Sequence, residues 1–183
     1  MRKIETKING LFIIKNKFFN DDRGWFMENW NIEKCKQNNL NINFKQDNIS
    51  MSKKNVLRGL HFQRQPHNQT KYVRVIQGKV LDVVVDIRKK SKTFGQHLAI
   101  ELSNNQTGLW IPAGMAHGFL SLEENTIFSY KCSGEYNPKY EHTIKWNDQD
   151  INIQWGIKHP IVSNKDNNGI SLKTYLESNQ IHG

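Results

Sequence analysis

Apolar and polar positions alternate over short stretches between residues 71 and 132, which is the pattern of β-strands with one buried face. KYVRVI at 71–76 and VLDVVVDIR at 80–88 are rich in β-branched residues and flank a turn at Gly78, so they predict a hairpin. Further short runs follow at short intervals: HLAIELS, TGLWIP, HGFLSL and NTIFSYKC. This spacing predicts an all-β sandwich or barrel, and we expect a mostly antiparallel barrel or jelly roll.

Helical patterns are sparse and short. IEKCKQNNL at 32–40 is one candidate, and ISLKTYLE at 170–177 is another, with Leu172, Tyr175 and Leu176 on one face. We expect both to lie at the periphery of the barrel. The chain has 183 residues, 37% of them hydrophobic, without an internal repeat or a Pro/Gly/Ser-rich linker, so a single domain over 1–183 is predicted.

The formal charge of +9 and the pI near 9.5 suit an anionic partner. Lys and Arg are scattered, with only short groups such as 52–55 and 88–90, and this argues against nucleic acid in favour of a small anionic substrate. No run approaches the roughly 18 apolar residues of a membrane span, and the N-terminal stretch lacks the pattern of a secretory signal. Cys35 and Cys132 form no CxxC pattern, so a reduced, cytoplasmic protein is predicted.

The stretch VLRGLHFQRQPHNQTKYVRV at 56–75 places charged groups where a strand should bury one face. Arg58, His61, Lys71 and Arg74 could each belong to an ordinary solvated strand face. They could instead line a polar pocket formed by strands, with His61 placed to move a proton.

Two other polar stretches are ambiguous on their own. In DDRGWFMEN at 21–29, Arg23 and Glu28 bracket an aromatic pair and could hold a phosphate and a hydroxyl. In FKQDNIS at 44–50, Gln46 and Asn48 offer amide groups beside a strand. Taken alone, a turn between strands is the more common explanation of the first stretch, and a polar loop is the more common explanation of the second.

The spacing Pro112-x-Gly114-x-x-His117 within LWIPAGMAHGF resembles the second motif of the cupin superfamily, whose fold is a double-stranded β-helix. That resemblance implies a turn that delivers His117 into the mouth of the barrel. In metal-binding cupins the first motif supplies His-x-His and a glutamate, whereas this chain has His61-Phe-Gln63. The incomplete set of imidazoles predicts that no metal is bound.

Several long motifs together resemble the dTDP-4-dehydrorhamnose 3,5-epimerase family, cofactor-free cupins of nucleotide-sugar metabolism. They are VLRGLHFQ, QTKYVRV, GKVLDVVVDIRKKSKTFG, LWIPAGMAHGFLSL and YEHTIKWND, and the resemblance runs from residue 4 to residue 166. It implies His61 as general base with Asp166 as its carboxylate partner, Lys71 near the sugar and Tyr130 as proton donor. It also implies nucleotide and phosphate contacts from Arg23, Glu28, Gln46, Asn48, Arg58, His117, Glu141 and Lys165.

The chain departs from this family in a few loops. Lys92 stands where the family usually has proline, Gly156 follows Trp155 where proline is common, and His142-Thr143 follows Glu141. These departures concern loop shape. The segment RQPHN at 64–68 is expected to face the approach to the pocket and to influence substrate preference.

The implied substrate, dTDP-4-keto-6-deoxy-D-glucose, has a ketone at carbon 4 that acidifies the protons on carbons 3 and 5. No cofactor is therefore expected. His61, with a reference pKa near 6.5, would remove a proton with support from Asp166. Lys71 would stabilise the enolate, and Tyr130 would return a proton from the opposite face to give dTDP-4-keto-L-rhamnose.

Three alternatives stay open. The chain could invert carbon 3 only, or act as a keto-isomerase of a related nucleotide sugar. A non-catalytic sugar-nucleotide-binding cupin is disfavoured because His61 and Tyr130 are both present. The resemblance also implies a homodimer with exchanged N-terminal strands, and the apolar stretch Leu11–Ile14 is consistent with strand pairing at an interface.

Overall fold

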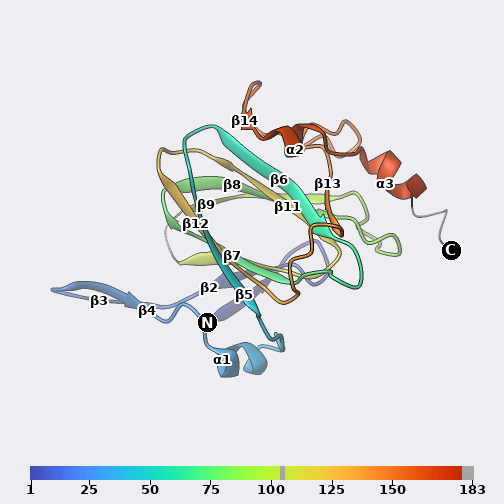
Figure 1. Cartoon of the computed structure of the whole chain (residues 1–183). Coiled ribbons are helices and arrows are strands. Elements are labelled where there is room, and N and C mark those ends of the chain that lie inside the picture. The colour runs from blue at the N-terminus through green and yellow to red at the C-terminus, as the bar shows by residue number, and fades with distance from the viewer. Residues whose placement is uncertain (104–105, 179–183) are drawn as a thin grey trace.

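The computed structural model describes residues 1–103 and 106–178, and most of these residues belong to two antiparallel sheets that enclose a common core (Figure 1). In spatial order the first sheet contains β1 (Arg2–Glu5), β2 (Phe12–Lys15), β10 (Thr107–Ile111), β7 (Lys71–Gln77), β12 (Thr126–Cys132) and β5 (Gln46–Ser52). The second contains β13 (Glu141–Thr143), β6 (Val56–Gln63), β11 (Met115–Ser121), β8 (Lys79–Asp86) and β9 (His97–Ser103), with β14 (Ile161–Val162) parallel to β6. This arrangement confirms the predicted all-β barrel.

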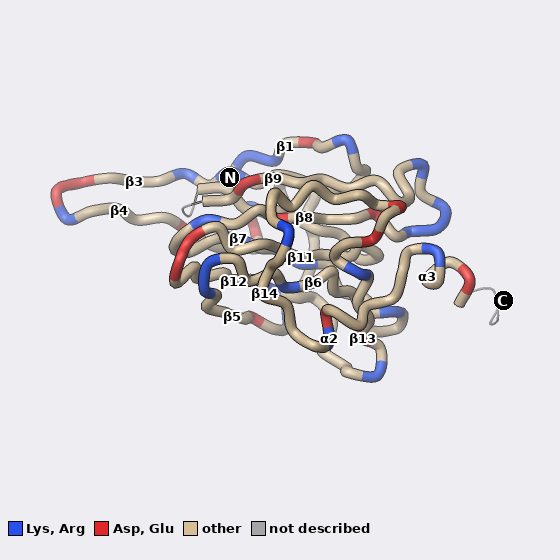
Figure 2. Tube along the Cα trace, turned by 90° about the horizontal axis from the view of Figure 1, so that it is seen from above, with Lys and Arg blue, Asp and Glu red and all other residues tan. Residues whose placement is uncertain are grey.

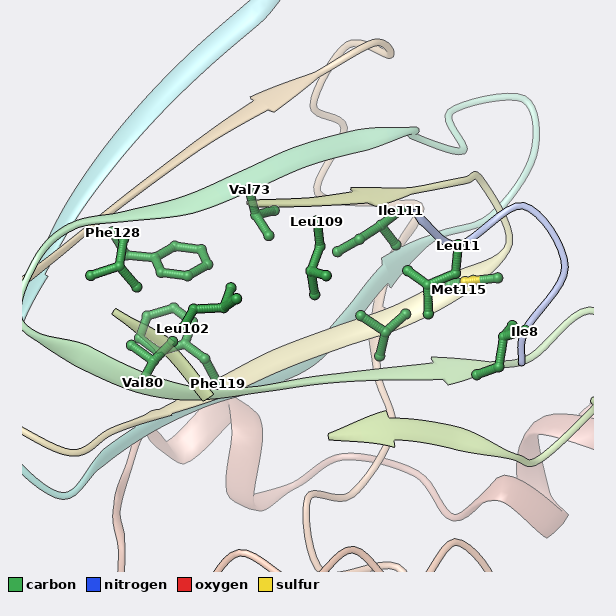
Figure 3. Close-up of a cluster of buried hydrophobic side chains, with 12 residues drawn as sticks. Ile8, Leu11, Val73, Val80, Leu102, Leu109, Ile111, Met115, Phe119 and Phe128 are labelled. Atoms are coloured by element: carbon green, nitrogen blue, oxygen red, sulfur yellow. The ribbon is translucent and has the colours of Figure 1, made fainter. Parts of the chain in front are cut away.

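The main core lies between the two sheets (Figure 3). Val73, Leu109 and Phe128 project from the first sheet and meet Val80 and Phe119 from the second, and all five are almost fully buried. Because alternate residues of a strand point to opposite faces, one face of each strand supplies this core.

A second apolar cluster covers the outer face of the second sheet. Val83 and Val85 of β8 point outward and pack in a cluster that includes Trp155 and Leu172 from the C-terminal part of the chain. Val84 between them joins the central core. The run of three valines at 83–85 in β8 therefore reflects burial on both faces of this strand.

The predicted hairpin between residues 71 and 88 is wrong. β7 pairs with β10 and β12, whereas β8 pairs with β9 and β11, so the chain crosses from one sheet to the other at Gly78. Gly78 has φ +83°, and a Cβ there would lie 2.5 Å from Oγ1 of Thr126. The local pattern indicated a sharp reversal correctly, but strand alternation does not distinguish a hairpin from a corner between two layers.

The helices are peripheral, as predicted, with slightly different bounds. α1 (Ile32–Gln37) begins after Asn31, whose side chain accepts a hydrogen bond from the Lys34 amide, and ends before Asn39, which has φ +58°. α3 (Leu172–Ser178) begins two residues later than expected. α2 (Asn164–Asn167) is a single turn that the sequence pattern did not predict. No helix in the described ranges is long and apolar enough to cross a membrane.

The hairpin of β3 (Phe18–Asp21) and β4 (Gly24–Met27) extends away from the barrel (Figure 1). Its aromatic side chains are unusually exposed, with Trp25 at 56% and Phe26 at 66%. Within one copy of the chain this hairpin therefore lacks an apolar surface to cover it.

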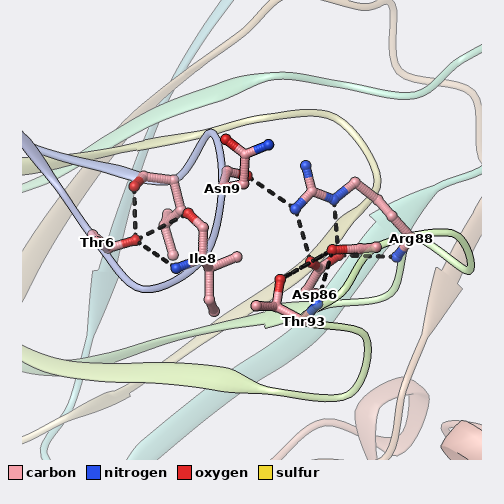
Figure 4. Close-up of polar contacts among 8 residues, drawn as sticks. Thr6, Ile8, Asn9, Asp86, Arg88 and Thr93 are labelled. Carbon is pink, nitrogen blue, oxygen red and sulfur yellow. Dashed lines mark hydrogen bonds and ion pairs between the residues drawn. The ribbon is translucent and has the colours of Figure 1, made fainter.

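A buried carboxylate holds the loop after β8 (Figure 4). Asp86 accepts hydrogen bonds from the Arg88 guanidinium at 2.7 and 2.8 Å and from the hydroxyls of Ser91 and Thr93 at 2.6 Å. Arg88 also donates to the backbone oxygen of Asn9 at 2.9 Å, which joins this loop to the N-terminal segment.

Candidate active site

A cavity opens between the two sheets. The predicted site residues that line it are Gln46, Asn48, Arg58, His61, Lys71, His117, Tyr130, Glu141 and Lys165. They come from β5, β6, β7, β11, β12, β13 and α2, so the fold gathers residues that are widely separated in sequence. Arg58, His61 and Lys71 thus line a pocket rather than a solvated strand face. Arg74 does not line this cavity: it is buried elsewhere and donates to the Asn29 backbone oxygen.

His61 of β6 and Asp166 of α2 are directly bonded, with His61 Nε2 2.5 Å from Asp166 Oδ1. Asp166 is also held by the Gly59 amide, which donates to Oδ2 at 3.1 Å, and its own amide donates to Ser163 Oγ. Burial alone would raise the pKa of the Asp166 carboxyl, but the hydrogen bonds and charge of His61 and the Gly59 amide hold it below its usual value. The pair has the arrangement of a histidine base oriented by a carboxylate.

Two glycines allow β6 and β11 to approach closely beside this pair. The register between these strands shifts between His117 and Phe119. A Cβ on Gly118 would lie 2.6 Å from the Arg58 backbone oxygen, and one on Gly59 would lie 2.5 Å from Gly118 Cα. Only glycine fits at this close contact, which places His117 directly opposite His61.

Lys71 enters the cavity from the other sheet, on β7. Its Nζ donates to the His61 backbone oxygen at 3.4 Å. Burial lowers the pKa of the Lys71 ammonium, and the negative charges of groups nearby, Glu141 and Asp82 among them, oppose this shift. A desolvated ammonium next to the base is suited to stabilise an enolate oxygen.

Tyr130 projects from β12, in the sheet opposite to the one that carries His61. Its ring lies 6.3 Å from that of Phe128. Burial raises the pKa of the Tyr130 phenol, so the hydroxyl keeps its proton at neutral pH. The cavity therefore has a histidine paired with a carboxylate on one wall and a protonated phenol on the other.

His117 is paired with a second carboxylate, that of Asp82 on β8. Its Nε2 lies 3.1 and 3.0 Å from the two carboxylate oxygens of Asp82, which is completely buried. Sequence reasoning missed Asp82. The available signal was a charged residue on the inward face of β8, between the apolar residues Val80 and Val84.

The remaining predicted contacts form the rim and walls. Gln46 Nε2 donates to Asn48 Oδ1 at 2.9 Å, and both lie on β5. Arg58 Nε donates to Ser52 Oγ at 3.0 Å, which directs the guanidinium along the cavity edge. Lys165 and Glu141 form an ion pair on the opposite rim.

Tyr136 also lines the cavity, although no local sequence pattern indicates it. Its hydroxyl donates to Glu141 Oε2 at 2.8 Å, and more than half of the side chain is exposed. Only the position of its loop beside the rim brings it to the site.

Arg23 and Glu28 do not reach this cavity. Arg23 is at the tip of the β3–β4 hairpin, where its guanidinium binds Asp21 at 2.6 Å and its side chain is 90% exposed. Glu28 is at the base of the hairpin and binds Lys34 at 2.7 Å. The expectation that both residues join the site is therefore not met within one chain, because the hairpin projects away from the barrel.

Gln63 stands at the position of the second histidine in metal-binding cupins, and its side chain here has a structural role. Its amide nitrogen donates to the backbone oxygens of His67 and Glu135 at 2.8 and 3.1 Å, and its oxygen accepts from the Asn137 amide at 2.7 Å. It thus ties the loop after β6 to the loop after β12. The described residues contain no group of three His, Cys, Asp or Glu side chains that could hold a metal ion.

The segment at 64–68 does not line the cavity, whereas the neighbouring Gln69 does. Gln69 donates to the Gly134 backbone oxygen at 2.9 Å. The influence of 64–68 on substrate preference accordingly stays a prediction.

Comparison with known proteins gives a consistent result. The family model for dTDP-4-dehydrorhamnose 3,5-epimerase matches residues 5–174. The enzyme of that name from Methanothermobacter thermautotrophicus is 46% identical over 176 residues, which cover 94% of this chain and 95% of the relative. A crystal structure of dTDP-6-deoxy-D-glucose-3,5-epimerase from Legionella pneumophila in complex with dTDP-4-keto-L-rhamnose has a TM-score of 0.90 and 40% identity, covering 94% and 93% of the two chains.

A more distant structure shows how widely this fold is shared. A 3'-monoepimerase from Streptomyces bikiniensis in complex with dTDP-quinovose has a TM-score of 0.90 at 31% identity, covering 95% and 89% of the two chains. The barrel alone consequently does not determine how many carbons are inverted.

Proposed function

The chain belongs to the dTDP-4-dehydrorhamnose 3,5-epimerase family, and we propose that the cavity between its sheets is where dTDP-4-keto-6-deoxy-D-glucose becomes dTDP-4-keto-L-rhamnose. The protein is thus an isomerase that inverts carbons 3 and 5 of a dTDP-linked sugar. The observation that carries the proposed site is the 2.5 Å contact between His61 Nε2 and Asp166 Oδ1 on the wall opposite Tyr130.

His61 acts as the base. It removes the proton from carbon 3 or carbon 5, and the electron pair of that C–H bond moves to form an enolate with the ketone oxygen at carbon 4. Asp166 fixes the orientation of the ring and stabilises the imidazolium that forms. A base positioned in this way contributes roughly 10²–10⁴-fold to the rate.

Lys71 stabilises the enolate. Its ammonium lies next to the base and supplies positive charge where the oxyanion develops. Because burial lowers its pKa, the ammonium is also a stronger hydrogen-bond donor to that oxygen than a solvated lysine.

Tyr130 returns a proton to the opposite face of the same carbon, and this inverts the centre. The phenol loses one proton and His61 gains one, so exchange with solvent restores both groups before the second carbon reacts. The raised pKa of Tyr130 keeps the donor protonated between turnovers.

The nucleotide diphosphate is held by the polar rim. Arg58 and Lys165 supply positive charge for the phosphates, and Gln46 and Asn48 supply amide groups for the nucleoside. His117 and Glu141 complete the substrate contacts. This use of basic side chains accounts for part of the net charge of the chain.

A homodimer would supply the two residues that the cavity lacks. The exposed β3–β4 hairpin would carry Arg23 and Glu28 to the cavity of a second copy. Exposed apolar side chains support such an interface, since Trp25 and Phe26 on the hairpin and Ile49 on the outer face of β5 are all more than half exposed. The nucleotide-linked substrate and the unpaired Cys35 and Cys132 fit a cytoplasmic enzyme.

Deuterium incorporation tests the function. The protein is incubated with dTDP-4-keto-6-deoxy-D-glucose in deuterated water, and the label is located by NMR. Incorporation with inversion at carbons 3 and 5 is the expected result. Inversion at carbon 3 alone would identify a monoepimerase, and the absence of exchange at either carbon would contradict the proposed site.

A further inference from the structure

We propose that a groove between the loop after β8 and the loop joining β1 to β2 is a separate binding site, and that its ligand is a small soluble anion with two or more phosphate groups. The residues that line this basic groove are Lys7, Asn9, Arg88, Lys90, Ser91, Lys92 and Thr93. None of them lines the cavity that contains His61. The inference therefore goes beyond the proposed function and does not depend on it.

Positive charge in the basic groove is largely unbalanced. Four of its lining residues are cationic, and the ion pair between Asp86 and Arg88 neutralises one of them. Lys7, Lys90 and Lys92 are exposed and form no ion pair within the part of the chain that the structure describes. Three like charges that share one groove repel one another, and an anion that binds between them removes this repulsion.

The backbone that carries these cations is held in place. Asp86 accepts hydrogen bonds from the hydroxyls of Ser91 and Thr93, which both belong to the groove. Arg88 joins the two loops, because it donates to the Asn9 backbone oxygen at 2.9 Å (Figure 4). A preformed backbone reduces the entropy that is lost when a ligand binds. The basic groove is thus a fixed part of the fold, and only its exposed lysine side chains have to be ordered by a ligand.

Arg88 also offers the groove a donor that Asp86 does not use. Its Nε and Nη2 donate to the carboxylate at 2.8 and 2.7 Å, whereas Nη1 has no hydrogen-bond partner among residues 1–103 and 106–178. Figure 4 shows this third guanidinium nitrogen pointing away from Asp86. The side chain is 28% exposed, so Nη1 can donate to a phosphate oxygen while the carboxylate fixes the guanidinium plane.

The arrangement of the cations indicates the class of anion. Nucleic-acid sites usually have basic side chains in a stripe that follows the phosphate backbone, whereas these side chains come from two short loops and line one groove. A single phosphate group carries about −1.5 to −2 charges at neutral pH. Three unbalanced lysines and a free guanidinium N–H therefore match a compact anion with more than one phosphate group.

The basic groove is far from the surface that the proposed dimer uses. Figure 1 shows the loop after β8 and the β3–β4 hairpin on opposite sides of the barrel. In Figure 2 the basic residues of this loop form a run of blue at the end of the molecule away from the hairpin. A dimer contact through the hairpin would therefore be made at a different part of the surface.

Tripolyphosphate is the probe, and NMR locates where it binds. The ¹⁵N-labelled protein is titrated at constant ionic strength, and amide shifts are followed along the whole chain. The amides of 7–9 and 88–93 should shift together and saturate. Binding in the substrate cavity would instead move amides near Arg58 and Lys165, so the two sites are distinguished in one experiment. Shifts confined to the substrate cavity, or spread over all exposed lysines, would overturn the proposal.

A double variant tests the lysines. Lys90→Ala combined with Lys92→Ala removes two of the three unbalanced charges and should weaken binding at the groove roughly tenfold. Lys53→Ala combined with Lys54→Ala is the matched control, because it removes the same charge from another exposed turn. This control should bind tripolyphosphate like the wild type. Equal weakening in both double variants would show general attraction to a basic surface and would contradict the proposal.

Two further titrations test whether the phosphates belong to a small anion. Vesicles that contain phosphatidylglycerol and a single-stranded oligonucleotide should each bind the groove less tightly than tripolyphosphate does. Tighter binding of either one at 88–93 would overturn the assignment to a small soluble anion.

Thermal unfolding gives an independent measurement. A ligand that binds only the folded protein raises its Tm, so tripolyphosphate should raise the Tm of the wild type more than that of the Lys90→Ala, Lys92→Ala variant. Equal increases in the two proteins would contradict the proposal. Because no substrate is used, these results stand whether or not the protein epimerises a sugar.

Discussion

His61 and His117 lie opposite each other on neighbouring antiparallel strands, and each is bonded through Nε2 to a carboxylate from a different element. Asp166 reaches His61 from a one-turn helix near the C-terminus, whereas Asp82 reaches His117 from the adjacent strand β8. The two imidazoles are therefore held in different surroundings: the His61 side chain is 29% exposed, and that of His117 is 8% exposed.

His61→Asn should reduce exchange at both carbons by at least about 10²-fold, because it removes the proposed general base. Binding of dTDP should be nearly unchanged, since the rim residues hold the nucleotide. Deuterium incorporation and calorimetric titration with dTDP measure the two effects. Exchange at close to the wild-type rate would disprove the assignment of His61.

Tyr130→Phe should separate exchange from inversion. Deuterium should still enter the sugar through His61, because proton removal does not need the phenol. Inversion at carbon 5 should fall by about 10²-fold, since the opposite wall has lost its proton donor. NMR of the sugar ring reports both quantities. If the variant inverts both carbons at full rate, another group supplies the proton.

Mixing two impaired variants should restore activity if the β3–β4 hairpin of each subunit completes the cavity of the other. Arg23→Ala should weaken substrate binding and His61→Asn should block chemistry, so each homodimer is impaired. In a mixed dimer both defects fall on one cavity, and the other cavity is intact. Activity after subunit exchange measures this effect.

Two controls accompany the mixing experiment. Asp22→Ala, at the same exposed hairpin tip, should leave activity unchanged. Absence of recovery, in a sample shown by mass spectrometry to contain mixed dimers, would place Arg23 and His61 in the same subunit's site or outside it.

The Asp86 network should make stability fall in acid. Burial opposes the shift, but hydrogen bonds from Arg88, Ser91 and Thr93 lower the pKa of Asp86 to about 2. This pKa lies below the value of about 3.9 in the unfolded chain. The ionised carboxylate therefore adds about 2 kcal/mol to the free energy of unfolding above about pH 3.9, and this contribution disappears as the pH falls toward 2.

Urea unfolding from pH 7 to pH 3 measures the predicted acid dependence. Asp86→Asn should be less stable at pH 7 and should lose less stability than the wild type over this range. Equal slopes for the two proteins would show that the native pKa of Asp86 is ordinary.

Gly118→Ala should destabilise the protein by about 1–3 kcal/mol, because the added methyl would meet the Arg58 backbone oxygen at 2.6 Å. The strands that carry His61 and His117 would separate, so epimerase activity should fall as well. Thermal unfolding and kcat measure the two effects. A variant with unchanged stability would show that the strand contact is not tight.

The strand-rich fold could be predicted from the sequence, and so could most of the residues that line the candidate cavity. The alternation from 71 to 132 identified strands because side chains of a half-buried strand face two different environments. The motifs around His61, Lys71, Tyr130 and Asp166 carried the resemblance to a known family. In the structure the first three residues line one cavity, and Asp166 is bonded to His61.

How distant segments meet could be seen only in the three-dimensional structure. It assigned β7 and β8 to different sheets, paired Asp82 with His117 and placed Tyr136 on the rim. It also separated Arg23 from the cavity of its own chain. The physical reason is that alternation reports which face of a strand is buried, whereas pairing between strands and the approach of loops depend on contacts that are non-local in sequence.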